Sequence, residues 1–328
     1  MKIVEILILT GAMPSSITIT HDVLTTANRL RRIAGRAPAF DIRITGSGGR
    51  AARAFLGDTA SADASDTPAD LIIVPGLGLT SEADVTALRA RRDAQAAKKQ
   101  IVEAVARGAE VATSCSGVFL FADAGVLDNR RVTSTWWLAP VFRALHPDIA
   151  LDVDALVVRD GPVTTAGAAL AQMDLMLALV ATHADAALAR HCARYLLLDA
   201  RRSQSRYMAL AFLAAADPHV ATAEAWARKR LHKDFSIDDM ASAAGLAPRT
   251  FARHVERASG LSPVRFLQRL RIEVALELLE TTKLSFDEVA RRVGYAEPST
   301  LRRIIRRDAG EAPSRLRSPA PRLAGRRG

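Results

Sequence analysis

Ser236-Ile237-Asp238-Asp239-Met240-Ala241, followed by Gly245, recurs 49 positions later as Ser285-Phe286-Asp287-Glu288-Val289-Ala290, followed by Gly294. The positions after each glycine recur as well, now 50 apart: Phe251, Arg253, Val255, Gly260 and Pro263 return as Leu301, Arg303, Ile305, Gly310 and Pro313. The repeat keeps the serines, the glycines and the apolar spacing, but it changes the residues between them. Such a pattern is typical of one small structural unit used twice.

Each copy predicts two helices joined by a tight turn. The serine that opens each copy is a good helix N-cap, and the acidic residues behind it suit the positive end of a helix dipole. Gly245 and Gly294 stand where the first helix must end, because glycine accepts a positive φ. Second helices are expected over residues 248–258 and 298–308. A helix, a glycine turn and a helix form the helix-turn-helix, whose second helix enters the major groove of DNA.

The second helices carry residues suited to reading DNA. Phe251 and Val255 mark the buried side of one helix, and Leu301, Ile304 and Ile305 mark that of the other. Arginine can bond both acceptors of a guanine edge, and serine or threonine can bond a base or a phosphate. A solvated surface is the ordinary alternative for a single charged helix, and the repetition favours DNA binding instead. The predicted DNA-binding residues are Arg249, Thr250, Arg253, Ser299, Thr300, Arg302, Arg303 and Arg306.

The positive charge is concentrated in the same region. The chain has 328 residues and a net charge of +10. Residues 217–328 hold 22 Lys and Arg against 14 Asp and Glu, a net of +8, which leaves +2 for the first 216 residues. A basic region of this kind adds salt-dependent affinity for phosphates.

The last hundred or so residues resemble the AraC/XylS family of bacterial transcription regulators. The matching motifs are Ala241-Ser242-Ala243-Ala244-Gly245-Leu246, Arg249-Thr250-Phe251-Ala252-Arg253, Gly260-Leu261-Ser262-Pro263, residues 270–279, Val289-Ala290-Arg291-Arg292-Val293-Gly294-Tyr295, Gly310-Glu311-Ala312-Pro313 and Arg317. The resemblance implies a rigid helix between two readers that enter successive major grooves. Leu301 and Ile305 depart from the family, which often has phenylalanine there, and Ala252 stands where a longer polar residue often reads a base.

The first two thirds of the chain alternate between short strands and helices. Strands are expected over residues 4–9, 41–45, 71–74, 110–113 and 163–165, with a pair near 131–134 and 155–159, and helices over 21–33, 83–107 and 117–124. This alternation predicts an α/β sandwich with a mostly parallel, flavodoxin-like sheet. Such sheets bind ligands at the carboxyl ends of their strands, which here are the loops Pro75-Gly76-Leu77-Gly78 and Ser114-Cys115-Ser116-Gly117.

The second loop places Cys115 at a strand-to-helix turn, as in a nucleophile elbow. Free amides and the helix dipole are expected to lower the pKa of a thiol there, and Gly76 would supply an amide for an oxyanion. Residues 2–187 resemble the PfpI-like, class I glutamine amidotransferase-like superfamily through both loops and through Gly125-Val126-Leu127-Asp128, Thr133-Ser134-Thr135-Trp136 and Thr164-Thr165-Ala166-Gly167. With the AraC-type tail, the chain is similar to GlxA-type regulators.

The sequence favours sensing over catalysis. Catalytic members of the superfamily have a histidine about twenty residues after the elbow, where this chain has Thr135, and threonine cannot take up a proton near neutral pH. The acidic partner expected near residues 11–18 is missing, and His21, expected at the start of a helix, has no supporting motif. We therefore expect no catalytic residue, metal or cofactor. A DNA-tethered cysteine hydrolase or glyoxalase-like enzyme, and a redox sensor acting through Cys115, are the alternatives.

The predicted ligand site consists of Gly76, Cys115, Ser116, Thr135 and Trp136. Backbone donors, a thiol, hydroxyls and an aromatic wall suit a small polar effector, and the resemblance implies a nitrogenous metabolite. Trp136 is also compatible with an ordinary core role. The resemblance further implies a homodimer, and RNA polymerase is a candidate partner. No apolar stretch reaches membrane-spanning length, and two cysteines form no disulfide framework, so we expect a cytoplasmic protein.

Four segments follow from these patterns. Residues 1–200 are expected to form the sensing and dimerisation domain, and residues 201–216 the linker with a junction helix over 207–216. Residues 217–318 form the predicted DNA-binding domain with its two helix-turn-helix units. Residues 319–328 are a basic tail, too polar and arginine-rich to build a core.

Overall fold

Short aliphatic runs form a six-stranded sheet in the N-terminal part of the chain. The computed structural model describes residues 1–56, 67–198, 201, 203–204 and 207–309. The strand order is β2-β1-β3-β4-β8-β7, and every neighbouring pair is parallel except β7 and β8. The strands are β1 (Lys2–Leu7), β2 (Phe40–Thr45), β3 (Leu71–Val74), β4 (Glu110–Ser114), β7 (Val157–Asp160) and β8 (Val163–Ala166). The predicted mostly parallel sheet is confirmed.

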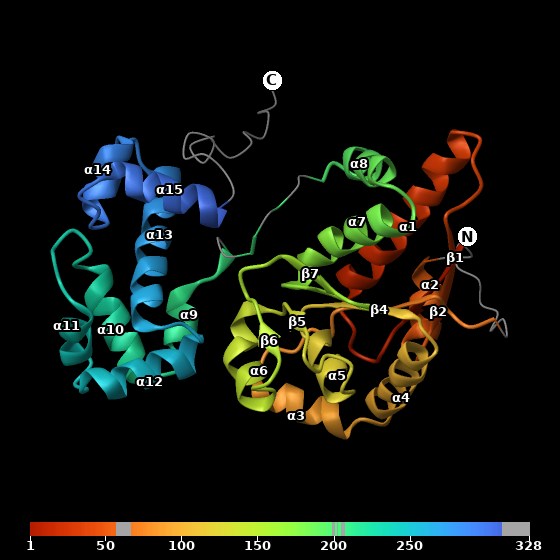
Figure 1. Cartoon of the computed structure of the whole chain (residues 1–328), viewed down its shortest axis with the longest axis horizontal. Helices are drawn as coiled ribbons and strands as arrows, with labels where there is room; N and C mark the ends of the chain where they lie inside the picture. The colour runs from red at the N-terminus through yellow and green to blue at the C-terminus, as the bar shows by residue number, and fades with distance from the viewer. Residues whose placement is uncertain (57–66, 199–200, 202, 205–206, 310–328) are drawn as a thin grey trace, which may run out of the picture. The chain divides into compact units, whose positions relative to one another are not determined.

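Helices cover both faces of this sheet, which explains why β3 and β8 are apolar or buried at every position. On one face lie α1 (Pro14–Ile33), α7 (Gln172–His183) and α8 (Ala186–Tyr195), which pack on one another (Figure 1). The other face carries α3 (Glu82–Ala90), α4 (Arg92–Ala106) and α5 (Gly117–Asp123) (Figure 1). Shorter elements complete the unit: α2 (Gly49–Leu56), β5 (Arg131–Val132), η1 (Trp136–Leu138), α6 (Ala139–Leu145), β6 (Ala150–Leu151) and η2 (Ala169–Ala171).

Three expected elements differ from the observed ones. Helix α1 begins at Pro14 rather than residue 21, since proline has the right φ for a first helical position, and His21 therefore lies well inside a helix and is buried. The expected helix 83–107 is two helices, because Arg91 is extended and its guanidinium binds Asp93 and the carbonyl of Thr10. The strand near residue 131 does not pair with the one near 155; β5 pairs with β6 in a separate two-stranded sheet.

Contacts divide the chain into two units, Met1–Gln204 and Ser205–Gly328. The expected junction helix 207–216 is shorter, because α9 spans only Leu210–Ala214. The basic tail 319–328, the family motif from Gly310 to Pro313 and Arg317 lie outside the described residues. Among the described residues, no helix is both long enough and apolar enough to cross a bilayer.

The second unit is helical in every element that the structure describes. The helices after α9 are α10 (Pro218–Arg228), α11 (Ile237–Ala243), α12 (Pro248–Ser259), α13 (Pro263–Thr281), α14 (Phe286–Arg292) and α15 (Pro298–Ala309). Helix α13 has 19 residues and is about 28 Å long. It contacts α12 of the first helix-turn-helix and both helices of the second (Figure 1). This confirms the predicted pair of helix-turn-helix units joined by a long helix.

Two polar clusters hold α10 within this unit. The guanidinium of Arg228 donates to Glu224 on its own helix and to Glu273 on α13, both at 2.6 Å. At the other end, Asp217 caps the first amides of α10 and accepts from His254 at 2.7 Å and from Arg257 at 3.2 Å. Burial opposes ionisation of Asp217, but the bonds from His254, Val220 and Arg257 outweigh it and lower the pKa of the carboxyl group.

We expect Asp217→Ala to lower the free energy of unfolding by about 1–3 kcal/mol, because it removes a helix cap and leaves the partly buried imidazole of His254 without this partner. Since the folded-state pKa is depressed, this stabilisation is present above the ordinary aspartate pKa and is lost as the pH falls through the folded-state value. Urea unfolding of the full chain, followed by circular dichroism, measures both effects. The exposed first-turn residue Asp238, changed to alanine, is the control, and equal losses in both variants would contradict the assignment.

Candidate functional site

Each helix-turn-helix begins with the same reciprocal pair of hydrogen bonds. The hydroxyl of Ser236 accepts from the amide of Asp239, and the Asp239 carboxylate accepts from the amide of Ser236 at 2.8 Å. Ser285 and Glu288 repeat this capping box in the second copy, at 2.7 Å. The bonds from the two serines lower the pKa of each capping carboxyl group. Both first helices therefore start at a fixed residue, which sets the position of the helix that follows.

The second helices, α12 and α15, present the predicted polar residues outward. Phe251, Val255, Leu301 and Ile305 are buried completely, and Ile304 nearly so. Thr250 and Thr300 are half-buried at the edge of this surface. The exposed members of the predicted set are Arg249, Arg253, Ser299, Arg302, Arg303 and Arg306. The structure thus gives each copy one face that packs and one arginine-bearing face that is open to solvent.

Two contacts distinguish the second copy. The guanidinium carbon of Arg302 lies 4.9 Å from the ring centroid of Phe286, which restricts the side chain before any DNA is bound. Leu301 and Ile305, the departures from the family pattern, belong to an aliphatic core with Leu279 and Val289. Sequence periodicity identified the buried positions, but it did not identify the stacking of Arg302 on the preceding helix.

The two turn glycines are not equivalent. Gly245 has φ +70° and nothing within 4 Å of the position that a Cβ would take. Gly294 has φ +81°, and a Cβ there would lie 2.3 Å from the carbonyl oxygen of Leu231 and 3.2 Å from the guanidinium of Arg271. The second module therefore packs its turn directly against the chain that follows α10, whereas the first turn is open.

The second candidate site lies at the carboxyl end of β4. Cys115 has φ +54°, and its amide donates to the carbonyls of Ala166, at 3.0 Å, and Gly167, at 2.7 Å. At Gly117 a Cβ would lie 2.1 Å from the Thr113 hydroxyl, so glycine is required where α5 starts. This is the strained strand-to-helix turn that the sequence predicts.

Four of the predicted ligand-site residues come together at this turn. A Cβ on Gly76 would lie 3.2 Å from the Cβ of Cys115, and the Ser116 hydroxyl accepts from the amide of Leu79 at 3.0 Å. Thr135 contributes a hydroxyl beside the thiol. Trp136 is half-buried in η1, with its ring 5.4 Å from that of Trp137 and nearly perpendicular to it.

Two further serines belong to this site. The hydroxyls of Ser16 and Ser114 lie 3.3 and 3.2 Å from the position of a Cβ on Gly76, and both are buried without a hydrogen-bond partner among the described residues. Buried hydroxyls are rarely left unpaired, so these two are candidates to bond a polar ligand. Ser16 comes from the first turn of α1, a segment that carried no signal in the sequence beyond its lack of an acid.

The thiol itself is not activated. Cys115, Ser116 and Thr135 are fully buried, and burial raises the pKa of the Cys115 thiol despite the opposing influence of the neighbouring Ser116 and Thr135. The expected lowering by amides and the helix dipole is therefore wrong, because desolvation of the charged thiolate is the larger effect. Thr135, at the position expected for a base, contributes no titratable group near neutral pH.

Family comparison agrees with this elbow geometry. Residues 2–182 match the model of the DJ-1/PfpI family. The chain belongs to the DJ-1/PfpI family. A helix-turn-helix domain model matches residues 240–318, so this DJ-1/PfpI member also carries an AraC-type DNA-binding module.

Several similar proteins are named as transcription regulators. The HTH-type transcriptional regulator GlxA of Rhizobium meliloti is 26% identical over 64% of this chain and 65% of its own length. The HTH-type transcriptional regulator CdhR of Pseudomonas aeruginosa is 27% identical over 63% of this chain and 62% of its own length. The chain thus spans a little under two thirds of these relatives. A structure of the AdpA DNA-binding domain with target DNA is 37% identical over 31% of this chain and 90% of that chain, with a TM-score of 0.28.

The glycine comparison gives a matched test of the two turns. Gly245→Ala should lower the free energy of unfolding by about 1–2 kcal/mol, because a residue with a Cβ is strained in the left-handed conformation. Gly294→Ala should cost more, about 3 kcal/mol, because the methyl group also meets the Leu231 carbonyl. Urea unfolding of the two full-length variants measures the difference, and equal losses would contradict the packing at Gly294.

The raised thiol pKa predicts slow alkylation of Cys115. In a Cys192→Ser background, which leaves one thiol, iodoacetamide at neutral pH should label the native protein at least about tenfold more slowly than the urea-unfolded chain. Because the folded-state pKa is raised, labelling of the native protein should begin to increase only at a more alkaline pH. Mass spectrometry follows the reaction, and rapid native labelling at pH 7 would restore the reactive-cysteine hypotheses.

Proposed function

We propose that this protein is a DNA-binding transcription regulator whose DJ-1/PfpI domain, the expected residues 1–200, senses a small molecule without turning it over. The single observation that supports this most strongly is the duplicated module. Two capped helix-turn-helix units each bury one face of the second helix and leave arginines on the other. A solvated helix surface with no binding role does not explain why the exposed arginine face occurs in both copies.

Each second helix offers a different reading surface. Arg249 and Arg253 lie one helical turn apart on α12, the spacing that lets two side chains face the same groove. On α15, Ser299 and Arg303 take the matching places, joined by Arg302 and Arg306. Half-buried Thr250 and Thr300 are placed for phosphate contacts at the start of each helix. We therefore propose that the two modules read different base sequences.

The elbow is proposed as the sensing site because it is polar, buried and unsuited to nucleophilic catalysis. The thiol has a raised pKa, and Thr135 replaces the base. The unpaired hydroxyls of Ser16 and Ser114 can accept hydrogen bonds from N–H groups, which favours a small nitrogenous metabolite as the effector. Since Cys115, Ser116 and Thr135 have no exposed surface, the site must open to admit it.

The partners follow from the same proposal. Double-stranded DNA is the target, and a homodimer would match paired half-sites, since two-fold proteins bind two-fold operators. RNA polymerase is proposed as a contact of the DNA-bound form. The cytoplasm is the proposed location, because the bacterial chromosome lies there. Residues 201–216 would then connect the sensor to the DNA-binding domain, 217–318.

Loss of a reading arginine should weaken DNA binding without unfolding the protein. We expect Arg249→Ala, Arg253→Ala and Arg302→Ala each to weaken specific binding by about 1–3 kcal/mol, which is about 5- to 150-fold, and binding should also weaken steeply with salt. Fragments selected from the source genome, including the region upstream of the gene, serve in a fluorescence anisotropy titration. Arg190→Ala, at an exposed arginine on α8, is the control. A purified protein that selects no fragment at moderate salt contradicts the proposal.

A further inference from the structure

Gln204, the last residue of the N-terminal unit, is inserted into that unit rather than lying on its surface. Only 2% of its surface is exposed. Its side-chain nitrogen donates to the carbonyl of Ser134 at 3.0 Å, to the Thr133 hydroxyl at 3.2 Å and to the carbonyl of Ala155 at 3.3 Å. Its side-chain oxygen accepts from the amide of Ala168 at 3.1 Å. Every polar group of the carboxamide is therefore engaged with the N-terminal unit.

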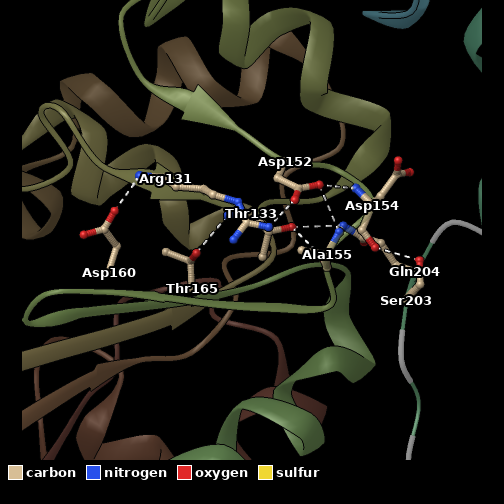
Figure 2. Close-up of polar contacts among 9 residues, drawn as sticks. All are labelled: Arg131, Thr133, Asp152, Asp154, Ala155, Asp160, Thr165, Ser203 and Gln204. Carbon is tan, nitrogen blue, oxygen red and sulfur yellow. Dashed lines mark hydrogen bonds and ion pairs between the residues drawn. The ribbon is translucent and has the colours of Figure 1, made fainter.

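The residues around Gln204 form a shaped receptor for it. The hydroxyl of Ser203 and the amide of Gln204 both donate to the carbonyl of Asp154, at 2.7 and 3.3 Å. Asp152 fixes this turn by accepting from the amides of Asp154 and Ala155 (Figure 2). Figure 2 also shows Thr133 bound to Thr165 of β8, so the receptor is continuous with the sheet.

Gly167 completes the receptor by lacking a side chain. A Cβ at this position would lie 2.3 Å from the side-chain oxygen of Gln204 and 2.5 Å from its amide carbon. Gly167 does not have a positive φ, so its backbone conformation does not demand glycine. The space that its missing methyl group would fill is the space that the Gln204 carboxamide occupies.

Ser134 connects this receptor to the elbow. Its hydroxyl donates to the carbonyl of Cys115 at 3.0 Å, and its own carbonyl accepts from Gln204. Gly167 likewise contacts both the elbow and Gln204. Its carbonyl accepts from the amide of Cys115, and its Cα lies against Gln204. A single residue therefore connects the buried turn at Cys115 to Gln204 on each of two routes, Ser134 on one and Gly167 on the other.

We propose that Gln204 is a latch that reports the state of the elbow to the DNA-binding unit. The inference rests on the proposed sensing function. A guest that opens the elbow would displace the segment from Thr133 to Thr135, because Thr135 lies beside the thiol and Ser134 bonds the carbonyl of Cys115. This displacement removes two of the three acceptors of the Gln204 side-chain nitrogen, the Thr133 hydroxyl and the Ser134 carbonyl. Once Gln204 leaves its receptor and Ser203 releases the carbonyl of Asp154, the last fixed point of the linker moves back to Arg201, which is held by Asp174 and the carbonyl of Leu170. Three more residues, about 10 Å of chain, become available to the tether.

The latch is tested from its two sides by proteolysis of the full-length protein. Gln204→Glu keeps the shape but loses the donor that three oxygens require, and Gly167→Ala fills the receptor from the opposite side. Arginines stand at positions 201, 202 and 206, so trypsin can cut close to Gln204. Both variants should be cut there about tenfold faster than the wild type, because proteolysis follows the population of the released form. Gln95→Glu, the same change at an exposed glutamine on α4, is the control.

Thermal unfolding identifies a variant that is merely unfolded, and Gln204→Ala provides a second, smaller change at the same position. Faster cutting at 201–206 in Gln204→Glu or Gln204→Ala, with the unfolding temperature of the N-terminal unit retained, supports the latch. Unchanged cutting in folded Gln204→Glu and Gly167→Ala variants overturns it. The readout needs no DNA, so a failure of the latch is distinct from a failure of DNA binding.

The link to the elbow has its own test. Gly76→Ala adds a methyl group 3.2–3.3 Å from Cys115, Ser114 and Ser16, which crowds the elbow without a ligand. Cutting at 201–206 should rise several-fold in this variant. The double variant with Gln204→Ala should be cut no faster than Gln204→Ala alone, because the latch is already open. No change in cutting in a folded Gly76→Ala variant would overturn the coupling.

Discussion

The amide of Cys115 donates to two carbonyls at once and thereby fixes the elbow of the N-terminal unit against the sheet. A residue with a Cβ has an unfavourable conformation at φ +54°, and the bonds to Ala166 and Gly167 keep it there. They also join the ends of β4 and β8, so the turn, the sheet edge and the loop at Gly167 cannot move separately. The burial of the thiol, the start of α5 and the receptor for Gln204 all depend on this one junction.

The helical half depends on repetition, but its two copies have different surroundings. Both begin with the same capping box, which fixes where the first helix starts. The second copy then packs its turn on the chain after α10 and stacks Arg302 on Phe286, whereas the first has an open turn and is tied to α10 through His254 and Asp217. The two similar local sequences therefore form similar local folds, but these folds make different contacts with the rest of the helical unit. The more constrained arginine face belongs to the second copy.

Much of this architecture could be predicted from local patterns. The serines at 236 and 285, the turn glycines and the alternation of strands and helices are signals contained in a few neighbouring residues. Features that depend on distant partners could not be predicted in this way. Helix breaking at Arg91 depends on Thr10 and Asp93, and the approach of the Ser16 hydroxyl to Gly76 joins residues of two separate elements. The raised pKa of Cys115 results from the burial of its side chain, which a turn motif in the sequence does not indicate.

The fit between Gly167 and Gln204 couples the choice of residue at two positions that are 37 residues apart. A side chain at 167 and the glutamine at 204 compete for the same space, so a side chain is accommodated at 167 only if the carboxamide of Gln204 gives way. Exchanging sensor domains between regulators of this kind therefore requires a junction after residue 204. A junction placed earlier, at the end of α8, would pair one protein's receptor with another protein's connector.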